Sequence, residues 1–150
     1  MLDAWPQPSR GIGVSQNMSA IQEPTRVLVV DDEHAIADTM TMILAASHFE
    51  ARAAYSALEA LSLLDTFTPH AVITDVMMPG MTGIELALHL GDRLPLCKVL
   101  LMSGYNSAFE LVEQSLQGAY CPTILCKPVR PQQILAFVQS CDPNGPRPAA

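Results

Sequence analysis

The feature that most constrains this fold is a fivefold alternation of short apolar runs with longer stretches of helical periodicity. The alternation begins at Arg26 and ends at Cys141, and the second apolar run is the weakest. Strands that alternate with helices pair in parallel and are covered on both faces. The pattern therefore predicts an α/β protein with a doubly wound, five-stranded parallel sheet. The expected strands cover residues 27–30, 50–54, 71–74, 98–102 and 123–126.

After each run, apolar residues recur every three or four positions, which is typical of helices with one buried face. The second helix should open at Ser56, where Glu59 completes a capping box, and the third should cover residues 84–92. The fourth should follow Asn106 and the fifth should begin near Pro131. The residues expected to face the core from the first two helices are Ile36, Met40, Ile43 and Leu44, then Leu58, Leu61 and Leu64.

Length and charge limit the classes of function. The 150 residues fit one domain, and 49% apolar against 15% charged residues supplies a core. The net charge of -7 repels nucleic-acid phosphates and anionic lipids, so we expect no direct binding to nucleic acid or membranes. No stretch has the roughly 18 apolar residues that a membrane span needs.

The two ends differ from the alternating region. We expect residues 1–25 to be a disordered N-terminal extension, residues 26–141 to be the folded domain, and residues 142–150 to be a proline-rich disordered tail. Met18 is an alternative translation start. The chain start lacks the basic and apolar pattern of a secretory signal, and its four cysteines are scattered, so we expect a cytoplasmic protein.

Polar residues that can carry chemistry follow four of the five expected strands. Ligands of open parallel sheets bind beyond the carboxyl ends of the strands, and these ends supply Asp31 and Asp32, then Asp75, Ser103 and Lys127. Taken singly, each has an ordinary explanation as a helix cap, a turn residue or a solvated lysine. Together they predict one site that combines carboxylates, a hydroxyl and an ammonium group.

The chemistry of this set favours a divalent cation and a phosphoryl group. Two carboxylates within about 4 Å repel by roughly 4 kcal/mol at an effective dielectric near 20, and Mg²⁺ prefers oxygen ligands of this kind. Asp75 could then act as a nucleophile that forms an acyl phosphate. Lys127 would share the charge on the phosphoryl oxygens, and Ser103 would donate a hydrogen bond to one of them.

Four ordered motifs give the chain a resemblance to a known family. They are VLVVDDE from position 27, TDVMMPG from position 74, LMSG from position 101 and CKP from position 126. In this order and spacing they resemble the receiver domain of two-component response regulators, most of all the single-domain, chemotaxis-regulator-like members. The resemblance implies a flavodoxin-like sheet with strand order 2-1-3-4-5.

The resemblance also implies roles for individual residues. Asp75 would be the phosphoacceptor, Asp32 a direct Mg²⁺ ligand and Asp31 an outer acidic partner. The backbone carbonyl of Met77 would complete the protein's metal ligands. Ser103 and Lys127 would stabilise the phosphoryl group and take part in the switch, with a cis bond after Lys127.

Three positions shape how such a switch would behave. Ile124 occupies a place where the family usually has Tyr or Phe, so the usual aromatic readout is not expected. The family tunes the lifetime of the acyl phosphate at the positions of Met77 and Tyr105. Neither side chain orients a water well, which predicts slow self-dephosphorylation.

The sequence thus predicts a signalling switch rather than an enzyme with turnover. A sensor histidine kinase or a histidine phosphotransfer protein would supply the phosphoryl group, and an unidentified protein would receive the signal. The resemblance also allows a phosphorylation-dependent homodimer. The alternatives are a phosphorylation-independent adaptor on the same fold, an Asp-nucleophile phosphatase and an FMN-binding flavodoxin-like protein. The phosphatase would need a second Asp where Met77 stands, and the Asp31–Asp32 pair would repel the phosphate of FMN.

Overall fold

The computed structural model of the protein describes residues 23–104, 114 and 122–143. Tyr105, the helix expected after Asn106, most of the predicted extension and most of the predicted tail lie outside these ranges. Within them, no helix is long and apolar enough to cross a bilayer. The elements are β1 (Arg26–Val30), α2 (His34–Ala46), β2 (Glu50–Ala54), α3 (Ala57–Leu63), β3 (Ala71–Asp75), α4 (Gly83–Arg93), β4 (Lys98–Ser103), β5 (Thr123–Cys126) and α6 (Pro131–Ser140).

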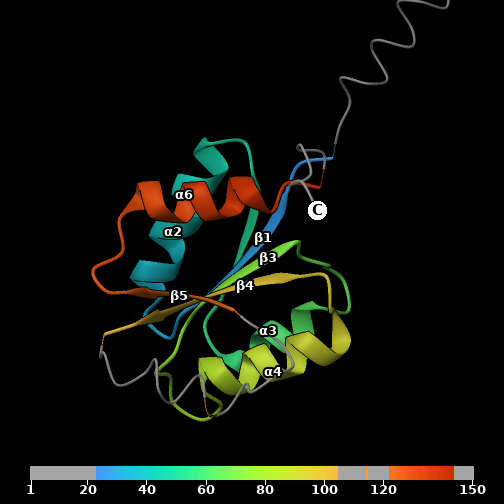
Figure 1. Cartoon of the computed structure of the whole chain (residues 1–150), viewed down its shortest axis with the longest axis vertical. Helices are drawn as coiled ribbons and strands as arrows, with labels where there is room; N and C mark the ends of the chain where they lie inside the picture. The colour runs from blue at the N-terminus through green and yellow to red at the C-terminus, as the bar shows by residue number, and fades with distance from the viewer. Residues whose placement is uncertain (1–22, 105–113, 115–121, 144–150) are drawn as a thin grey trace, which may run out of the picture.

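The five strands form one sheet in the order β2-β1-β3-β4-β5. All four neighbouring pairs are parallel, and the strands match the predicted runs to within a residue or two. Helices α2 and α6 cover one face of the sheet, and α3 and α4 cover the other (Figure 1). The fold prediction is therefore confirmed. The direction of winding reverses between β1 and β3, which is where open α/β sheets place their ligands.

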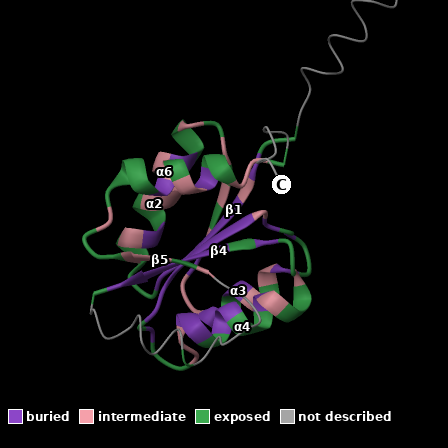
Figure 2. Cartoon of the chain, viewed as in Figure 1, coloured by how far each residue is buried: buried purple, intermediate pink, exposed green. Residues whose placement is uncertain are grey.

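Alternation along the strands divides the core between the two faces. Each strand residue points to the side opposite its neighbour, and burial is concentrated in the strands and the inner sides of the helices (Figure 2). The α3–α4 side buries, among others, Leu28, Val30, Val72 and Leu101. The α2–α6 side buries Val27, Val29, Ile73, Leu100 and Met102. Because both faces are covered, the strand sequences read as nearly continuous apolar runs.

The predicted core face of α3 is wrong at Leu58, which is 67% exposed. Leu64 is buried as predicted and Leu61 packs partly buried against the core, but Ala57 and Ala60 are buried in place of Leu58. Ser56 caps the helix by accepting a hydrogen bond from the Glu59 amide. In a short helix, two neighbouring faces can carry side chains at the same three- and four-residue spacing. Which of the two faces is buried depends on the residue at which the cap starts the helix.

The first helix shows a smaller difference of the same kind. In α2 the buried residues are Ala37 and Leu44, whereas Ile36, Met40 and Ile43 are only half-buried. Of the predicted residues, Leu44 is therefore fully buried in the core, and the other three are only partly covered. The half-buried members lie toward α6, where they line a groove with Ile134.

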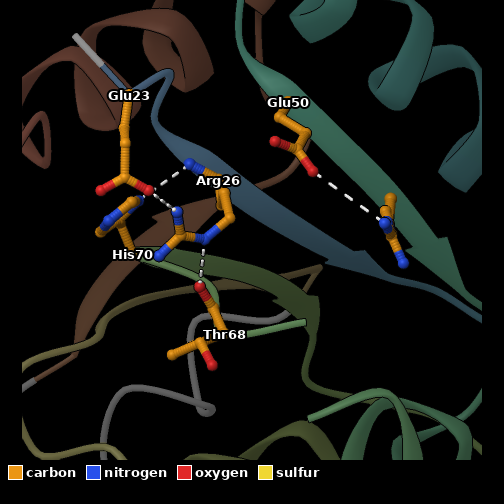
Figure 3. A network of polar contacts seen from close by, with 6 residues as sticks. Glu23, Arg26, Glu50, Thr68 and His70 are labelled. Atoms are coloured by element: carbon orange, nitrogen blue, oxygen red, sulfur yellow. Dashed lines mark hydrogen bonds and ion pairs between the residues drawn. The ribbon is translucent and has the colours of Figure 1, made fainter. Parts of the chain in front are cut away.

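A polar network holds the start of β1 at the edge of the sheet opposite the strand ends. Figure 3 shows Glu23, Thr68 and His70 gathered around Arg26. The Arg26 amide donates to His70 Nδ1 at 2.9 Å, and its guanidinium Nε donates to the Thr68 carbonyl at 2.6 Å. Burial, together with the charge of Arg26, lowers the pKa of His70 and keeps the accepting nitrogen unprotonated. The network fixes β1 against the start of β3.

Candidate functional site

The four strands next to one another in the sheet bring the predicted site residues to one edge. Asp31 directly follows β1, Asp75 ends β3, Ser103 ends β4 and Lys127 directly follows β5. The register places Asp75 beside Met102, one residue before Ser103 on the neighbouring strand. Parallel strands end on the same side, so the polar groups share this edge because their strands do.

Three carboxylates converge there. Asp31, Asp32 and Asp75 each have an oxygen within 4.8 Å of the others. Asp31 is fully buried and Asp75 is 7% exposed, whereas Asp32 faces solvent. At this separation two buried charges repel by about 3–4 kcal/mol at an effective dielectric near 20. The cluster therefore favours a bound cation.

Asp31 is the most constrained member of the cluster. Its amide donates to the Ala54 carbonyl at 3.1 Å, and its Oδ1 accepts from the Glu33 amide at 3.0 Å. Its Oδ2 is buried and accepts no hydrogen bond within the described ranges. Desolvation raises the pKa of Asp31, and the charges of Asp75 and Asp32 add to the rise. The Glu33 amide and the charge of Lys127 oppose it.

These observations test whether the residues fit Mg²⁺. A buried carboxylate oxygen without a donor is costly to the fold, and a hard cation satisfies such an oxygen directly. The donor set of Asp31, Asp32 and Asp75 is all oxygen and bears excess negative charge. The residues fit the ion that the sequence predicts.

Lys127 balances part of this charge. Its Nζ lies 3.1 Å from Oδ2 of Asp75, and the Lys127 amide donates to the Ser103 carbonyl at 2.8 Å. The peptide bond between Lys127 and Pro128 is cis, as the resemblance implies. The Ser103 side chain is buried at the end of β4. The site thus has one ammonium group against three carboxylates among the described residues.

The backbone at Asp75 is held by packing that the sequence did not reveal. The Val76 amide donates to the Met102 carbonyl, and the Gly83 amide at the start of α4 donates to the Val76 carbonyl, both at 2.9 Å. A Cβ on Gly83 would lie 2.1 Å from the Asp75 carbonyl oxygen. Gly83 lies just before the helix that the sequence predicts over residues 84–92, and its close approach was not predicted because it depends on how α4 meets β3.

The remaining predicted residues are less tightly placed. Met77 follows Asp75 by two residues, and its side chain is 59% exposed. Ile124 is half-buried in β5 against the α3–α4 side of the core. Tyr105 lies outside the described residues.

The comparison with protein families decides what kind of domain carries this site. Residues 27–139 match the response regulator receiver domain family. The chain belongs to this family. The receiver domain places it in two-component signalling, where domains of this kind accept a phosphoryl group.

Sequence relatives of the receiver domain are longer proteins. Response regulator MprA of Mycobacterium sp. strain KMS is 35% identical over 122 residues, which cover 78% of this chain and 50% of the relative. MprA of Mycobacterium tuberculosis strain H37Ra is 33% identical over 120 residues, covering 77% and 49%. The chain therefore spans about half the length of these curated relatives.

Solved structures match the receiver domain over nearly their whole length. A CheY-like receiver domain protein from Methanospirillum hungatei JF-1 is 27% identical, with a TM-score of 0.72, covering 81% of this chain and 97% of that one. Chemotaxis protein CheY4 of Vibrio cholerae is 26% identical, with a TM-score of 0.68, covering 78% and 98%. Both agree with the five-stranded parallel fold.

Proposed function

We propose that this protein is a signalling switch in which Asp75 accepts a phosphoryl group from a sensor histidine kinase or a histidine phosphotransfer protein. The observation that carries the proposal is the convergence of Asp31, Asp32 and Asp75, with Lys127 3.1 Å from Asp75, at the strand ends. The family gives the direction of transfer. The kinase, the phosphotransfer protein and the receiving partner are identified only by this chemistry.

In the proposed transfer, an Asp75 carboxylate oxygen attacks the phosphorus of a phosphohistidine. A P–O bond forms and the P–N bond breaks. The electron pair remains on the imidazole nitrogen, which takes up a proton. Asp75 suits the role of nucleophile because it is the carboxylate that Lys127 contacts, while its backbone is fixed by Val76 and Gly83.

The other groups of the site stabilise charge on the phosphoryl oxygens. Lys127 Nζ, which lies 3.1 Å from Asp75 Oδ2, would contact one phosphoryl oxygen. The Ser103 hydroxyl at the end of the neighbouring strand would donate a hydrogen bond to another. Asp31, Asp32, Asp75 and the backbone carbonyl of Met77 would hold Mg²⁺. When bound, the ion supplies neutralisation of the negative charge that the phosphoryl group brings.

The proposed output is a change of partner binding, not turnover of a substrate. A downstream protein would bind the phosphorylated form. A second copy of this chain could also bind it and form a homodimer. Ile124 provides no ring that could move between buried and exposed positions, so the signal would come from shifts around Ser103 at the end of β4. The absence of membrane or nucleic-acid binding by these residues remains a prediction from their charge.

The test of the proposal is incubation with acetyl phosphate and Mg²⁺, followed by intact-mass measurement. The wild type should gain one phosphoryl group, and Asp75→Asn should gain none. Asp65→Asn is a matched control, because Asp65 is an exposed aspartate that pairs with Arg93 at the end of α3 away from the predicted site residues, and it should gain the group normally. A wild type that stays unmodified, or an Asp75→Asn variant that is modified, contradicts the proposal.

The proposed site also predicts a long-lived acyl phosphate. Met77 is exposed two residues after Asp75 but cannot orient water, whereas an amide at this position could. We expect Met77→Asn to accelerate phosphoryl loss by about tenfold, which is below the ~100-fold of a true general base. The measurement is the decay of the phosphorylated mass after acetyl phosphate is removed. An unchanged decay rate would show that Met77 does not set the lifetime.

A further inference from the structure

The loop that carries Asp32 has few interactions of its own. Glu33, the N-cap of α2, makes no side-chain capping hydrogen bond, and the first turn of α2 has no acidic residue. The exposed Asp32 carboxylate accepts no hydrogen bond from the described part of the chain. Asp31, in contrast, is fixed by the end of β1 and by the Ala54 carbonyl. The described contacts within the loop are the hydrogen bond from the Glu33 amide to Asp31 Oδ1 and the bonds from the Ile36 and Ala37 amides to the Glu33 carbonyl, and none of them holds the Asp32 side chain.

A stacked aromatic pair meets the start of α2 from the neighbouring loop. His34, the first residue of α2, lies with its ring centroid 3.8 Å from that of Tyr55, and the two planes are inclined by 18°. The Tyr55 hydroxyl donates to Oδ1 of Asp38 at 2.6 Å. His34 and Asp38 are four residues apart and so share one face of the helix. Tyr55 therefore contacts α2 at two points within its first five residues.

Tyr55 is itself anchored to α3. Its amide donates to Oε1 of Glu59 at 2.7 Å, and the Glu59 amide donates to the Ser56 hydroxyl at 3.0 Å. The hydrogen bond to Asp38 raises the pKa of Tyr55, which keeps the donating proton in place. A continuous set of contacts thus runs from the cap of α3 through Tyr55 to the start of α2.

We propose that His34 and Tyr55 are positioning residues whose stack holds the Asp32 loop in the geometry that binds Mg²⁺. The inference rests on the proposed function and adds to it the contacts that preorganise the exposed ligand of the site, Asp32. Asp75 ends β3, and Asp31 is hydrogen-bonded to the Ala54 carbonyl and the Glu33 amide, whereas the Asp32 carboxylate has no such hydrogen bond among the described residues. Without the stack, the loop must be ordered when the ion binds, and this ordering weakens binding.

The experiment measures the dissociation constant for Mg²⁺ by calorimetry on the full chain. His34→Ala and Tyr55→Ala should weaken binding by about tenfold, at the low end of the change seen when supporting contacts around a metal are removed. His34→Phe keeps the stack and should stay within about twofold of the wild type. His89→Ala removes an exposed histidine from α4 and is the matched control.

The sign of the effect separates positioning from charge. A protonated histidine repels a cation, so removing His34 by charge alone would strengthen Mg²⁺ binding, opposite to the expected loss. Amide hydrogen exchange in Mg²⁺-free buffer gives a second readout. Residues 31–36 should exchange faster in Tyr55→Ala, while thermal unfolding stays close to that of the wild type.

The outcomes distinguish this inference from the proposed function. Wild-type binding with unchanged affinity in His34→Ala and Tyr55→Ala overturns the positioning role and leaves the proposed function standing. A loss of affinity that His34→Phe shares also overturns the role of stacking. A wild type that binds no Mg²⁺ overturns both.

Discussion

Asp31 is the residue at which the cost of the site to the fold is greatest. Its carboxylate is buried, two other carboxylates lie within 4.8 Å, and one of its oxygens has no donor in the described ranges. Burial of an unpaired charge destabilises a fold. The protein tolerates the arrangement because neighbouring strand residues bury enough apolar surface to offset it.

Replacing this charge should stabilise the protein when no metal is present. Asp31→Asn keeps the shape and the acceptor for the Glu33 amide while removing the repulsion. We expect its free energy of unfolding at neutral pH to rise by about 1–3 kcal/mol in Mg²⁺-free buffer. Urea denaturation measures the change. A variant less stable than the wild type would show that the carboxylate is not a burden to the fold.

The stability that Asp31→Asn gains over the wild type should depend on pH. The raised pKa means that folded Asp31 holds its proton more tightly than unfolded Asp31. The contribution of Asp31 to the free energy of unfolding of the wild type is therefore lost as the pH rises from 3.8, the ordinary pKa of an Asp, through the raised pKa of the folded state. The advantage of Asp31→Asn should shrink in acid and be full at neutral pH. Urea denaturation across this range checks it, and an advantage that grows in acid would contradict the assignment.

Sequence reasoning could name the site residues because each lies at a strand end or within two residues after it, and strand ends can be predicted from apolar runs; they are Asp31, Asp32, Asp75, Ser103 and Lys127. It could not show that Asp31 Oδ2 has no donor among the described residues, because that depends on how the surrounding side chains pack. Nor could it find the His34–Tyr55 stack, whose members are 21 positions apart and meet only after packing. No periodic pattern reports such a contact.

At the scale of elements, helix α4 and strand β3 together fix Asp75, the proposed phosphoacceptor. The Gly83 amide donates to the Val76 carbonyl, and Thr82 and Glu85 form a capping box around it. The helix therefore starts directly against the Asp75 backbone. Only glycine permits this approach, because any Cβ would overlap the Asp75 carbonyl.

Gly83→Ala should accordingly disturb both stability and the site. The added methyl must push α4 away from β3, which we expect to cost about 1–3 kcal/mol and to slow phosphorylation by acetyl phosphate. Thermal unfolding and intact-mass kinetics measure the two effects. Gly104→Ala is the control, since its Cβ would meet nothing within 4 Å. Equal behaviour of the two variants would refute the close packing described here.

The error at Leu58 belongs to this scale as well. The period of α3 was predicted, but its phase was not, because the apolar stripe through Leu58 and the small-residue stripe through Ala57 and Ala60 have the same spacing. Small alanine side chains let a helix approach a sheet closely. A hydrophobicity pattern does not show whether this close approach is more favourable than burying the leucine. The sequence pattern therefore predicts whether an element is a helix or a strand better than it predicts which face of a helix is buried.

At the scale of the whole molecule, topology creates the site. The order β2-β1-β3-β4-β5 puts β1 beside β3 and β3 beside β4, although neighbours in space are far apart in sequence. The strand order came from the resemblance, whereas alternation alone predicted only a parallel sheet. Once this order is fixed, the acidic pair, the proposed phosphoacceptor, the hydroxyl and the lysine must share one edge.

The most direct measurement is a crystal structure with Mg²⁺ and beryllium fluoride, which mimics a phosphoryl group. We expect the ion to be held by Asp31, Asp32 and Asp75. The fluoride adduct should lie on Asp75, with Lys127 and the Ser103 hydroxyl against it. Side chains that point away from one another around an empty edge, with the adduct absent from Asp75, would contradict the account.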